Sequence, residues 1–383
     1  MDNKICVYAI AKNEEQFVER WYNSMKEADL VVVLDTGSTD NTVDALEAIG
    51  VDIVETKIIN PWRFDTARNE SLKLVPDEYN ILVCTDLDEV FEEGWADKLR
   101  LSWDSNIHER AEYKYIWKHD SLGNPVVQYH YNKIHNRDWI WRTPVHEYLT
   151  RKDDEVNFYY YRNNACDLYN DITLHHYPDN NKSRGSYLSL LEIRAEEYAD
   201  TDPISLVYLA REYYFYNKFN DAIKVLNMIT TERSSVFDPM SLGFSYKLMG
   251  LSYIGLISDK FDDAYYNAIL AFNKGITANK SFLENYVCLA ELYITYDEHE
   301  LAKSYIEMGY KHANRRNNWM EDGDNWSYRP LEVLAIAYYC LGDKPKALSC
   351  AAKALTMKPN DESLSKNFNT ILSNMSINDI LKN

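Results

Sequence analysis

The sequence has few of the features that mark membrane-spanning and secreted proteins. No apolar stretch reaches the roughly 18 residues that cross a bilayer, although 46% of the 383 residues are hydrophobic. The first residues lead straight into a strand-like segment and do not have the shape of a signal peptide. We therefore expect a cytoplasmic protein without a transmembrane segment.

Cysteine is sparse and unpaired along the chain. The six cysteines are scattered, and no two of them form a Cys-x-x-Cys pair. This spacing argues against a zinc site and against a disulfide framework. It suits a reducing compartment such as the cytoplasm.

Positive charge is also scarce. The formal net charge is −19, and residues 1–180 hold 19 Lys and Arg against 34 Asp and Glu, while the remainder holds 22 against 26. A negative surface repels the phosphates of nucleic acids and anionic lipids, so neither is favoured as a partner. An acidic site that uses a nucleotide needs a cation to offset the charge of its substrate.

Residues 1–105 alternate between strand-like and helical patterns, with buried strands expected over 4–11, 30–34, 52–57 and 81–84. Such alternation predicts a parallel α/β sheet, in which ligands bind at the carboxyl ends of the strands. Four polar residues follow these predicted strand ends, so we expect them to converge in one crevice: Asn13, Asp35, Asp86 and Asp88.

Residues 111–178 are rich in tyrosine, tryptophan and β-branched residues. They predict antiparallel or mixed strands over 112–118, 126–134 and 156–162. A tryptophan-rich cluster, which runs from Trp139 to Glu147, lies between the last two of these segments.

From about Ser186 the pattern is helical and repeats. The small residues Ala210, Gly250, Ala290 and Ala335 recur at intervals of 40, 40 and 45 positions. This resembles the tetratricopeptide repeat (TPR), in which a small residue lets two antiparallel helices approach closely. The intervals exceed the usual repeat of about 34 residues, so we expect degenerate repeats whose aromatic residues mostly form the core.

Four motifs in the first half occur together, in an order and spacing that resemble glycosyltransferase family 2, which has the GT-A fold. The resemblance covers residues 4–100 well and 101–180 loosely. It predicts an α/β GT-A domain over 1–180, followed by an all-α, TPR-like domain over 181–383. The segment 208–214 is similar to a repeat extension found on a bacterial and phage branch of the family. The motifs are Ile10-Ala11-Lys12-Asn13-Glu14-Glu15, Val33 to Thr42, Phe64-Asp65-Thr66-Ala67-Arg68-Asn69 and Thr85-Asp86-Leu87-Asp88-Glu89.

The resemblance implies an inverting enzyme that moves a sugar from a nucleotide-sugar, with a UDP-sugar expected. Asn13 and Asp35 would bind the nucleotide, Asp35 through a base N–H, and Arg68 would contact it too. Asp86 and Asp88 would form the ribose and metal pair, with Asp88 the direct ligand of Mn²⁺ or Mg²⁺. The alternatives are a turn aspartate at 35, a surface ion pair at 68 and a solvated acidic turn at 86–88.

The general base and a further metal ligand are harder to assign. Glu147 is the preferred base, beside Trp141, on which a sugar could stack. A structural salt bridge is the alternative role for Glu147. Asp138 and Asp171 are the other candidate bases, and His176 is marginally preferred over His175 and His146 as a metal ligand.

Two other functions stay open. A sugar nucleotidyltransferase would need a glycine-rich phosphate loop after the first strand, where this chain has Lys12-Asn13-Glu14-Glu15. A non-catalytic TPR adaptor with a degenerate transferase domain would be favoured by loss of either aspartate of the Asp-x-Asp motif, and both are present. The acceptor is not identified: protein, glycan or lipid-linked glycan remain candidates, and the helical part would recognise it or mediate dimerisation.

Overall fold

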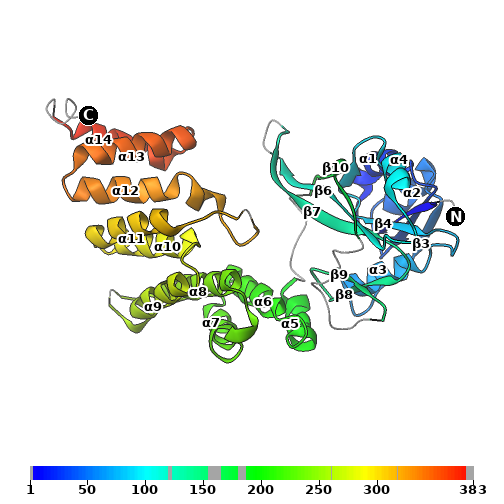
Figure 1. Cartoon of the computed structure of the whole chain (residues 1–383), viewed down its shortest axis with the longest axis horizontal. Coiled ribbons are helices and arrows are strands. Elements are labelled where there is room, and N and C mark those ends of the chain that lie inside the picture. Colours follow the sequence, from blue (N-terminus) through cyan, green and yellow to red (C-terminus); the bar gives the residue numbers. More distant parts are fainter. Residues whose placement is uncertain are drawn as a thin grey trace. The chain divides into compact units, whose positions relative to one another are not determined.

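The computed structural model describes residues 3–119, 123–153, 165–179, 187–259, 261–316 and 318–376. The chain divides into two compact units, residues 1–201 and 202–383, which we call the sheet unit and the helical unit (Figure 1). The division falls after Thr201, later than the predicted boundary between residues 180 and 181. Helix α5 (Tyr187–Tyr198) belongs to the sheet unit, where Arg194 Nη1 donates to the backbone carbonyl of Val145 at 2.8 Å.

The sheet unit contains one mixed sheet in the order β3-β2-β1-β4-β7-β6-β10-β5, and a separate β8-β9 pair. Strands β3, β2, β1 and β4 are parallel, as the sequence predicts, whereas β7 runs antiparallel to β4 and to β6. The predicted strand over 156–162 lies outside the described residues. The strands are β1 (Ile5–Ala11), β2 (Leu30–Asp35), β3 (Ile53–Thr56), β4 (Ile81–Thr85), β5 (Glu89–Phe91), β6 (Arg110–His119), β7 (Pro125–His135), β8 (Trp139–Arg142), β9 (Tyr148–Arg151) and β10 (Ala165–His176).

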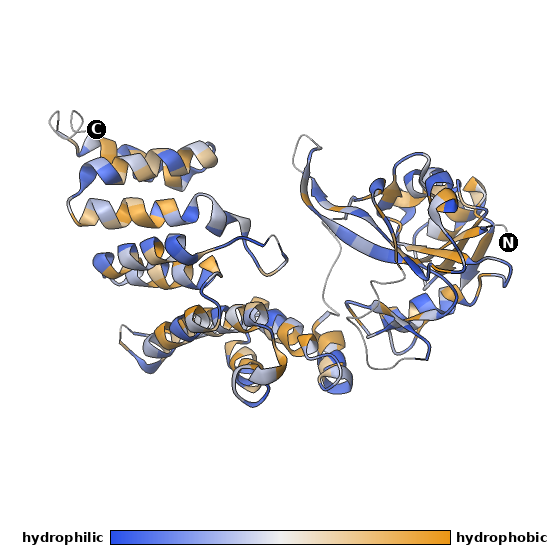
Figure 2. Cartoon of the chain, viewed as in Figure 1, coloured by the Kyte–Doolittle hydropathy of each residue, from blue (hydrophilic) through white to orange (hydrophobic). Residues whose placement is uncertain are grey.

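Both faces of β1, β2 and β4 are covered, which explains why these strands are apolar along most of their length (Figure 2). On one face, Ile5 and Val7 pack with residues of α1 (Glu15–Met25), α2 (Thr42–Ile49) and α4 (Trp95–Ser102). On the other face, Cys6 and Tyr8 pack with Leu72 of α3 (Phe64–Leu72) and with the tryptophans of β8.

The strand register brings the predicted crevice residues to one edge of the sheet. Ala11 of β1 pairs with Asp35 of β2, and Ala9 of β1 pairs with Thr85 of β4. Asp35 and the Asp86–Asp88 segment therefore leave the sheet at nearly the same level, two strands apart. Since neighbouring strands are about 4.8 Å apart, these segments are separated by roughly 10 Å.

The helical unit is built from pairs of neighbouring helices, and small residues lie where the helices meet. A Cβ atom on Gly250 would lie 2.5 Å from the Phe272 ring, so only glycine permits the α8–α9 approach. Ala210, Ala290 and Ala335 are likewise buried. The predicted fold class, an α/β GT-A domain followed by helical repeats, is confirmed. The helices are α6 (Ile204–Phe215), α7 (Phe219–Asn227), η1 (Met228–Glu232), η2 (Ser234–Val236), α8 (Pro239–Ile254), α9 (Asp263–Ala278), α10 (Leu283–Thr295), α11 (His299–His312), η3 (Gly323–Trp326), α12 (Arg329–Cys340), α13 (Lys344–Met357) and α14 (Glu362–Ser373).

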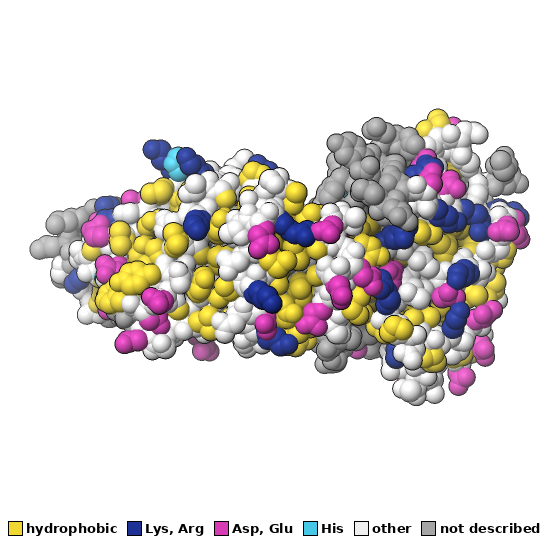
Figure 3. All heavy atoms as spheres, turned by 90° about the horizontal axis from the view of Figure 1, so that it is seen from below, with side chains coloured by type: hydrophobic (Ala, Val, Ile, Leu, Met, Phe, Trp, Pro, Cys, Tyr) yellow, Lys and Arg dark blue, Asp and Glu magenta, His cyan; other side chains and the backbone are white. Residues whose placement is uncertain are grey.

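Two surface properties bear on the expected partners. Within the described ranges, no helix has both the length and the apolar character that crossing a bilayer requires. On the face drawn in Figure 3, acidic and basic side chains are interspersed with apolar ones.

Candidate active site

Asp86, the first residue after β4, is held by two buried cations. Arg68 Nη2 donates to Asp86 Oδ1 at 2.8 Å, and Lys133 Nζ donates to Asp86 Oδ2 at 2.7 Å. Arg68 comes from α3 and Lys133 from β7, so three distant segments meet at this carboxylate. Because both oxygens of Asp86 already accept charged hydrogen bonds, the side chain is fixed in place before any ligand binds.

Lys133 extends this network to a second carboxylate, that of Glu89, which is buried. Its Nζ donates to Glu89 Oε1 at 3.1 Å, and Tyr115 Oη donates to the same oxygen at 3.0 Å. Glu89 Oε2 accepts the backbone N–H of Asp86 at 2.9 Å. Glu89 thus closes the turn that carries the Asp-x-Asp motif.

Arg68 connects the network to Glu147. Its Nε donates to Glu147 Oε1 at 2.6 Å, and its Nη1 lies 3.2 Å from the Cys84 thiol. The guanidinium lies 5.1 Å from the centre of the Trp141 ring, within cation–π range. Acidic and basic side chains therefore alternate along this network, in the order Glu147, Arg68, Asp86, Lys133 and Glu89.

The alternation of charge shifts the ionisation of each buried group. Burial opposes ionisation of Asp86, but Arg68 and Lys133 outweigh it and hold the pKa of Asp86 well below its usual range. Burial likewise disfavours the charged form of Lys133, yet Asp86 and Glu89 raise the pKa of Lys133 well above its ordinary value. For Glu89, burial dominates and raises the pKa.

Asp88 lies beside His176 at the end of β10. The two side chains approach to 3.3 Å between Asp88 Oδ2 and His176 Nε2, and the backbone N–H of Tyr177 donates to the Asp88 carbonyl at 2.8 Å. His176 Nδ1 lies 3.2 Å from the carbonyl oxygen of Trp117. Because a carbonyl can only accept, Nδ1 carries the hydrogen. Burial opposes the charged ring, but the Asp88 carboxylate beside Nε2 outweighs it and raises the pKa of His176. A cation at this position would take the place of the proton on Nε2.

This pair fits a divalent cation such as Mn²⁺ or Mg²⁺. An aspartate oxygen and an imidazole nitrogen are both acceptable ligands for Mn²⁺, and a carbonyl that fixes the second ring nitrogen is the usual support for such a histidine. Within the described part of the chain, no group of three or more acidic, His or Cys side chains could hold a metal. A cation at Asp88 and His176 would therefore take its remaining ligands from substrate phosphates and water, as Mg²⁺ commonly does.

Asn13 and Asp35 organise a loop two strands away. Asp35 accepts hydrogen bonds from the backbone N–H groups of Gly37 at 3.0 Å and Ser38 at 3.1 Å, and from the Ser38 hydroxyl. Asn13 Oδ1 accepts the Thr39 N–H at 2.7 Å, and the Asn13 N–H donates to Ser38 Oγ at 2.9 Å. Asp35 therefore stabilises a turn, which was the alternative to nucleotide binding expected for this residue.

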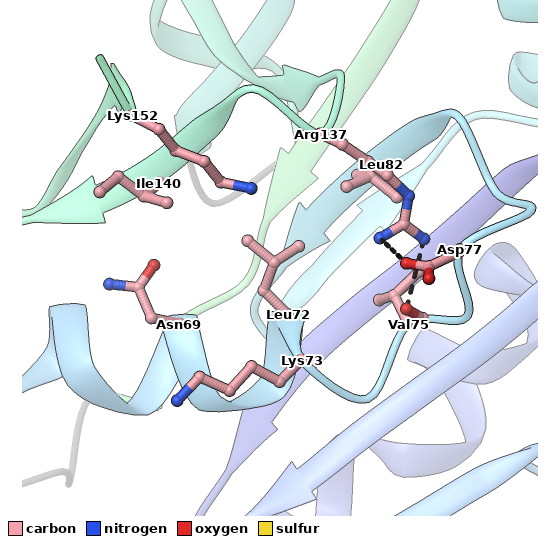
Figure 4. A pocket seen from close by; sticks show the side chains of 9 residues that line it. All are labelled: Asn69, Leu72, Lys73, Val75, Asp77, Leu82, Arg137, Ile140 and Lys152. Carbon is pink, nitrogen blue, oxygen red and sulfur yellow. Dashed lines mark hydrogen bonds and ion pairs between the residues drawn. The ribbon is translucent and has the colours of Figure 1, made fainter. Parts of the chain in front are cut away.

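A cavity of about 340 Å³ lies elsewhere in the sheet unit and contains none of these acidic groups (Figure 4). Arg137 in its wall is occupied, because its Nε donates to the Tyr79 carbonyl at 2.8 Å and its Nη1 lies 3.5 Å from Asp77. Lys73 in the wall is also paired, with Glu70 at 2.6 Å. Lys152 is the third cation of this wall, which also holds the acidic side chain of Asp77.

Comparison with protein families identifies the sheet unit. Residues 6–156 match the family described as glycosyl transferase family 2. These residues form a family 2 glycosyltransferase domain. A segment of 63 residues is also 41% identical to an uncharacterised glycosyltransferase of Rickettsia bellii, strain RML369-C. That match covers 16% of this chain and 20% of the Rickettsia protein, so the chain spans about a fifth of that relative's length.

Solved structures of TPR proteins are similar to the chain, at low identity. One is a thermophilic TPR protein of Thermus thermophilus, which is 18% identical, with 49% of this chain and 90% of that chain covered and a TM-score of 0.37. Another is MamA, which is 21% identical, with 48% of this chain and 96% of that chain covered and a TM-score of 0.35.

Several residues predicted for the family 2 site lie elsewhere or have other roles. Trp141 is only 3% exposed, and its Nε1 donates to Tyr8 Oη at 2.8 Å. Its ring therefore supports Arg68 from the core and offers no surface on which a sugar can stack. Glu147 is in the salt bridge that was its alternative role.

The two other candidate bases are remote from Asp86. Asp138 follows β7 at the opposite edge of the sheet, because His135 at the end of β7 pairs with Leu82 near the start of β4. Asp171 is exposed at a bulge in β10, where its carbonyl accepts Lys98 Nζ at 2.9 Å.

The three histidines that were candidate metal ligands have different surroundings in the structure. Both ring nitrogens of His175 have partners, Glu92 Oε1 at 3.1 Å and His119 Nε2 at 3.0 Å. The His146 ring packs edge-on against Tyr187, with ring centres 6.0 Å apart. Of the three candidates, His176 is the one beside Asp88.

Lys133 and Glu89 are important members of the network that the sequence reasoning missed. The signal for Lys133 was a single charged residue inside a long aromatic strand segment, Tyr129 to His135. The signal for Glu89 was its place directly after the Asp-x-Asp motif. Neither signal reveals a partner, because the partners come from strands and helices distant in sequence.

Proposed function

We propose that the sheet unit is a metal-dependent glycosyltransferase that uses a nucleotide-sugar, with a UDP-sugar the preferred donor. One observation carries the proposal: Asp88 and His176 lie together at the carboxyl edge of a family 2 sheet, beside a network that immobilises Asp86. Ligands of α/β sheets bind at this edge.

The nucleoside would extend from the cation toward the Asn13–Asp35 loop. The separation of roughly 10 Å between the two strand ends suits a nucleoside joined to a diphosphate. The loop's own donors, from Gly37 and Ser38, make four hydrogen bonds to the two oxygens of Asp35. Asp35 would therefore contribute to nucleoside binding by holding this loop in place.

The protein's own residues would prepare the displacement. A bound divalent cation would supply Lewis-acid stabilisation of the negative charge on the departing diphosphate. Asp88 and His176 would hold that cation, while Arg68 and Lys133 keep Asp86 ionised and directed toward the ribose. The Arg68 and Lys133 side chains are both buried, so their charges interact strongly with the Asp86 carboxylate.

Glu147 is our candidate for the group that takes the acceptor's proton in an inverting displacement. Arg68 fixes Glu147 Oε1, and no hydrogen bond to Oε2 is found among the described residues. Oε2 is thus the oxygen that would receive the proton. For the helical unit we propose a role in recognising a protein or an acceptor.

The test is hydrolysis of a panel of nucleotide-sugars, with and without Mn²⁺, by the wild-type chain and by His176→Gln. We expect Mn²⁺-dependent release of UDP by the wild-type chain and at least a tenfold loss in the variant. His130→Gln is the matched control, because His130 is a half-exposed histidine on β7. Hydrolysis without any metal requirement, or an unaffected His176→Gln variant, would contradict the proposal.

A further inference from the structure

The loop between α11 and α12 crosses the helical unit and binds on two earlier helices. It covers residues 313–328, whereas the α9–α10 connection covers only 279–282. The Trp319 ring stacks on Tyr208 of α6, with ring centres 5.2 Å apart, and meets Phe244 of α8 edge-on at 5.4 Å. The Arg211 guanidinium lies 5.2 Å from the Trp319 ring centre.

The base of this loop is fixed independently of Trp319. Glu284 of α10 is buried, and its Oε1 accepts the backbone N–H of Asp322 at 3.0 Å and the Trp326 Nε1–H at 3.3 Å. Asn314 N–H donates to the Ser281 carbonyl at 3.1 Å. These contacts hold the base of the loop without involving the Trp319 ring.

Trp319 is much less buried than the structural tryptophans of this chain. It is 46% exposed, whereas Trp21, Trp95, Trp139 and Trp141 are at most 3% exposed. Because hydrophobic stabilisation is proportional to the apolar area that is buried, a ring that is nearly half exposed contributes much less than a fully buried one. The surface beneath it combines the Tyr208 and Phe244 rings with the Arg211 guanidinium, and tyrosine and arginine are enriched in binding hot spots.

We propose that Tyr208, Arg211 and Phe244 form a binding site for an aromatic side chain of a partner peptide, and that Trp319 closes this site as an internal ligand. The segment now in place shows which chemistry fits: a tryptophan followed by Met320, Glu321 and Asp322. The partner segment is accordingly a tryptophan with carboxylates two and three residues after it. Such a segment binds when it displaces Trp319.

The probe is a labelled peptide with the sequence of residues 318–324, measured by fluorescence anisotropy against the full chain. Trp319→Ala opens the pocket, so we expect this variant to bind the peptide at least tenfold more tightly than the wild-type chain, which must first release its own ring. Phe244→Ala in the Trp319→Ala background removes part of the pocket, and binding should be lost.

Trp326→Phe is the matched control, because it changes the other tryptophan of the loop and leaves the pocket closed. It should bind the peptide as weakly as the wild-type chain. If Trp319→Ala binds no peptide, or binds no more tightly than the wild-type chain, the proposal is overturned and Trp319 is a structural contact. Peptide binding that survives Phe244→Ala would also overturn it.

Discussion

Replacing Lys133 by methionine should destabilise the sheet unit by about 3 kcal/mol. Lys133 is buried and is the ammonium shared by Asp86 and Glu89. Removing one partner from a buried ion pair costs about 3–5 kcal/mol. We expect the lower end, because Asp86 keeps Arg68 and Glu89 can take up a proton. For a unit of about 200 residues, this corresponds to a fall in Tm of about 6–12 °C.

The destabilisation caused by Lys133→Met should also depend on pH, in a direction that the pKa of Glu89 determines. Burial already raises the pKa of Glu89 above its ordinary value, and loss of Lys133 raises it further. A carboxyl group whose pKa is higher in the folded state loses stability as the pH rises through that range. The difference between Lys133→Met and the wild-type chain should therefore be larger at pH 8 than at pH 5, because a lower pH favours the protonated form of Glu89.

Denaturant unfolding followed by tryptophan fluorescence is a suitable assay. Seven of the nine tryptophans lie in residues 1–201, so the signal mainly reports the sheet unit. Lys118→Met is the matched control, because Lys118 is exposed on β6 and its loss should cost at most about 0.5 kcal/mol. Adding Glu89→Gln to Lys133→Met should restore part of the stability. A loss below 0.5 kcal/mol, or a loss that does not change with pH, would refute this reasoning.

Two other predictions concern the proton acceptor and a buried histidine. Glu147→Gln should retain UDP binding, measured by thermal shift, but lower the transfer rate at least a hundredfold; transfer at the wild-type rate would place the base elsewhere. Burial lowers the pKa of His135 to about 4, so only the unfolded chain takes up this proton as the pH falls from about 6.5 to 4. Stability should therefore drop by about 3 kcal/mol over that range. His135→Gln should weaken this dependence, and an unchanged pH profile would contradict the assignment.

Much of the fold could be predicted because local patterns and tertiary structure agree. The apolar segments at 5–11, 30–35 and 81–85 are strands at the predicted places, and parallel pairing then requires Asp35 and Asp86 to share an edge. Asp88 and His176 could be named as candidates from a motif and a short strand-like run. Their approach to 3.3 Å depends on β10 reaching the motif, which no local pattern predicts.

The failures in the site have a common physical cause. Trp141 was assigned to a sugar because tryptophan often stacks on ligands, but its parity in β8 turns the ring into the core under Arg68. Asp138 and Asp171 were candidates by residue type alone, and the strand directions place them away from Asp86. Lys133 was missed because a buried cation is recognisable only with its two carboxylates.

The most direct test of the central claim is a Mn²⁺ titration in the presence of UDP, followed by electron paramagnetic resonance of the free ion. We predict one Mn²⁺ site in the wild-type chain and at least a tenfold weaker site in Asp88→Asn. Asp97→Asn, which changes an exposed aspartate on α4, should bind as the wild-type chain does. Equal Mn²⁺ binding by Asp88→Asn and the wild-type chain would contradict the account.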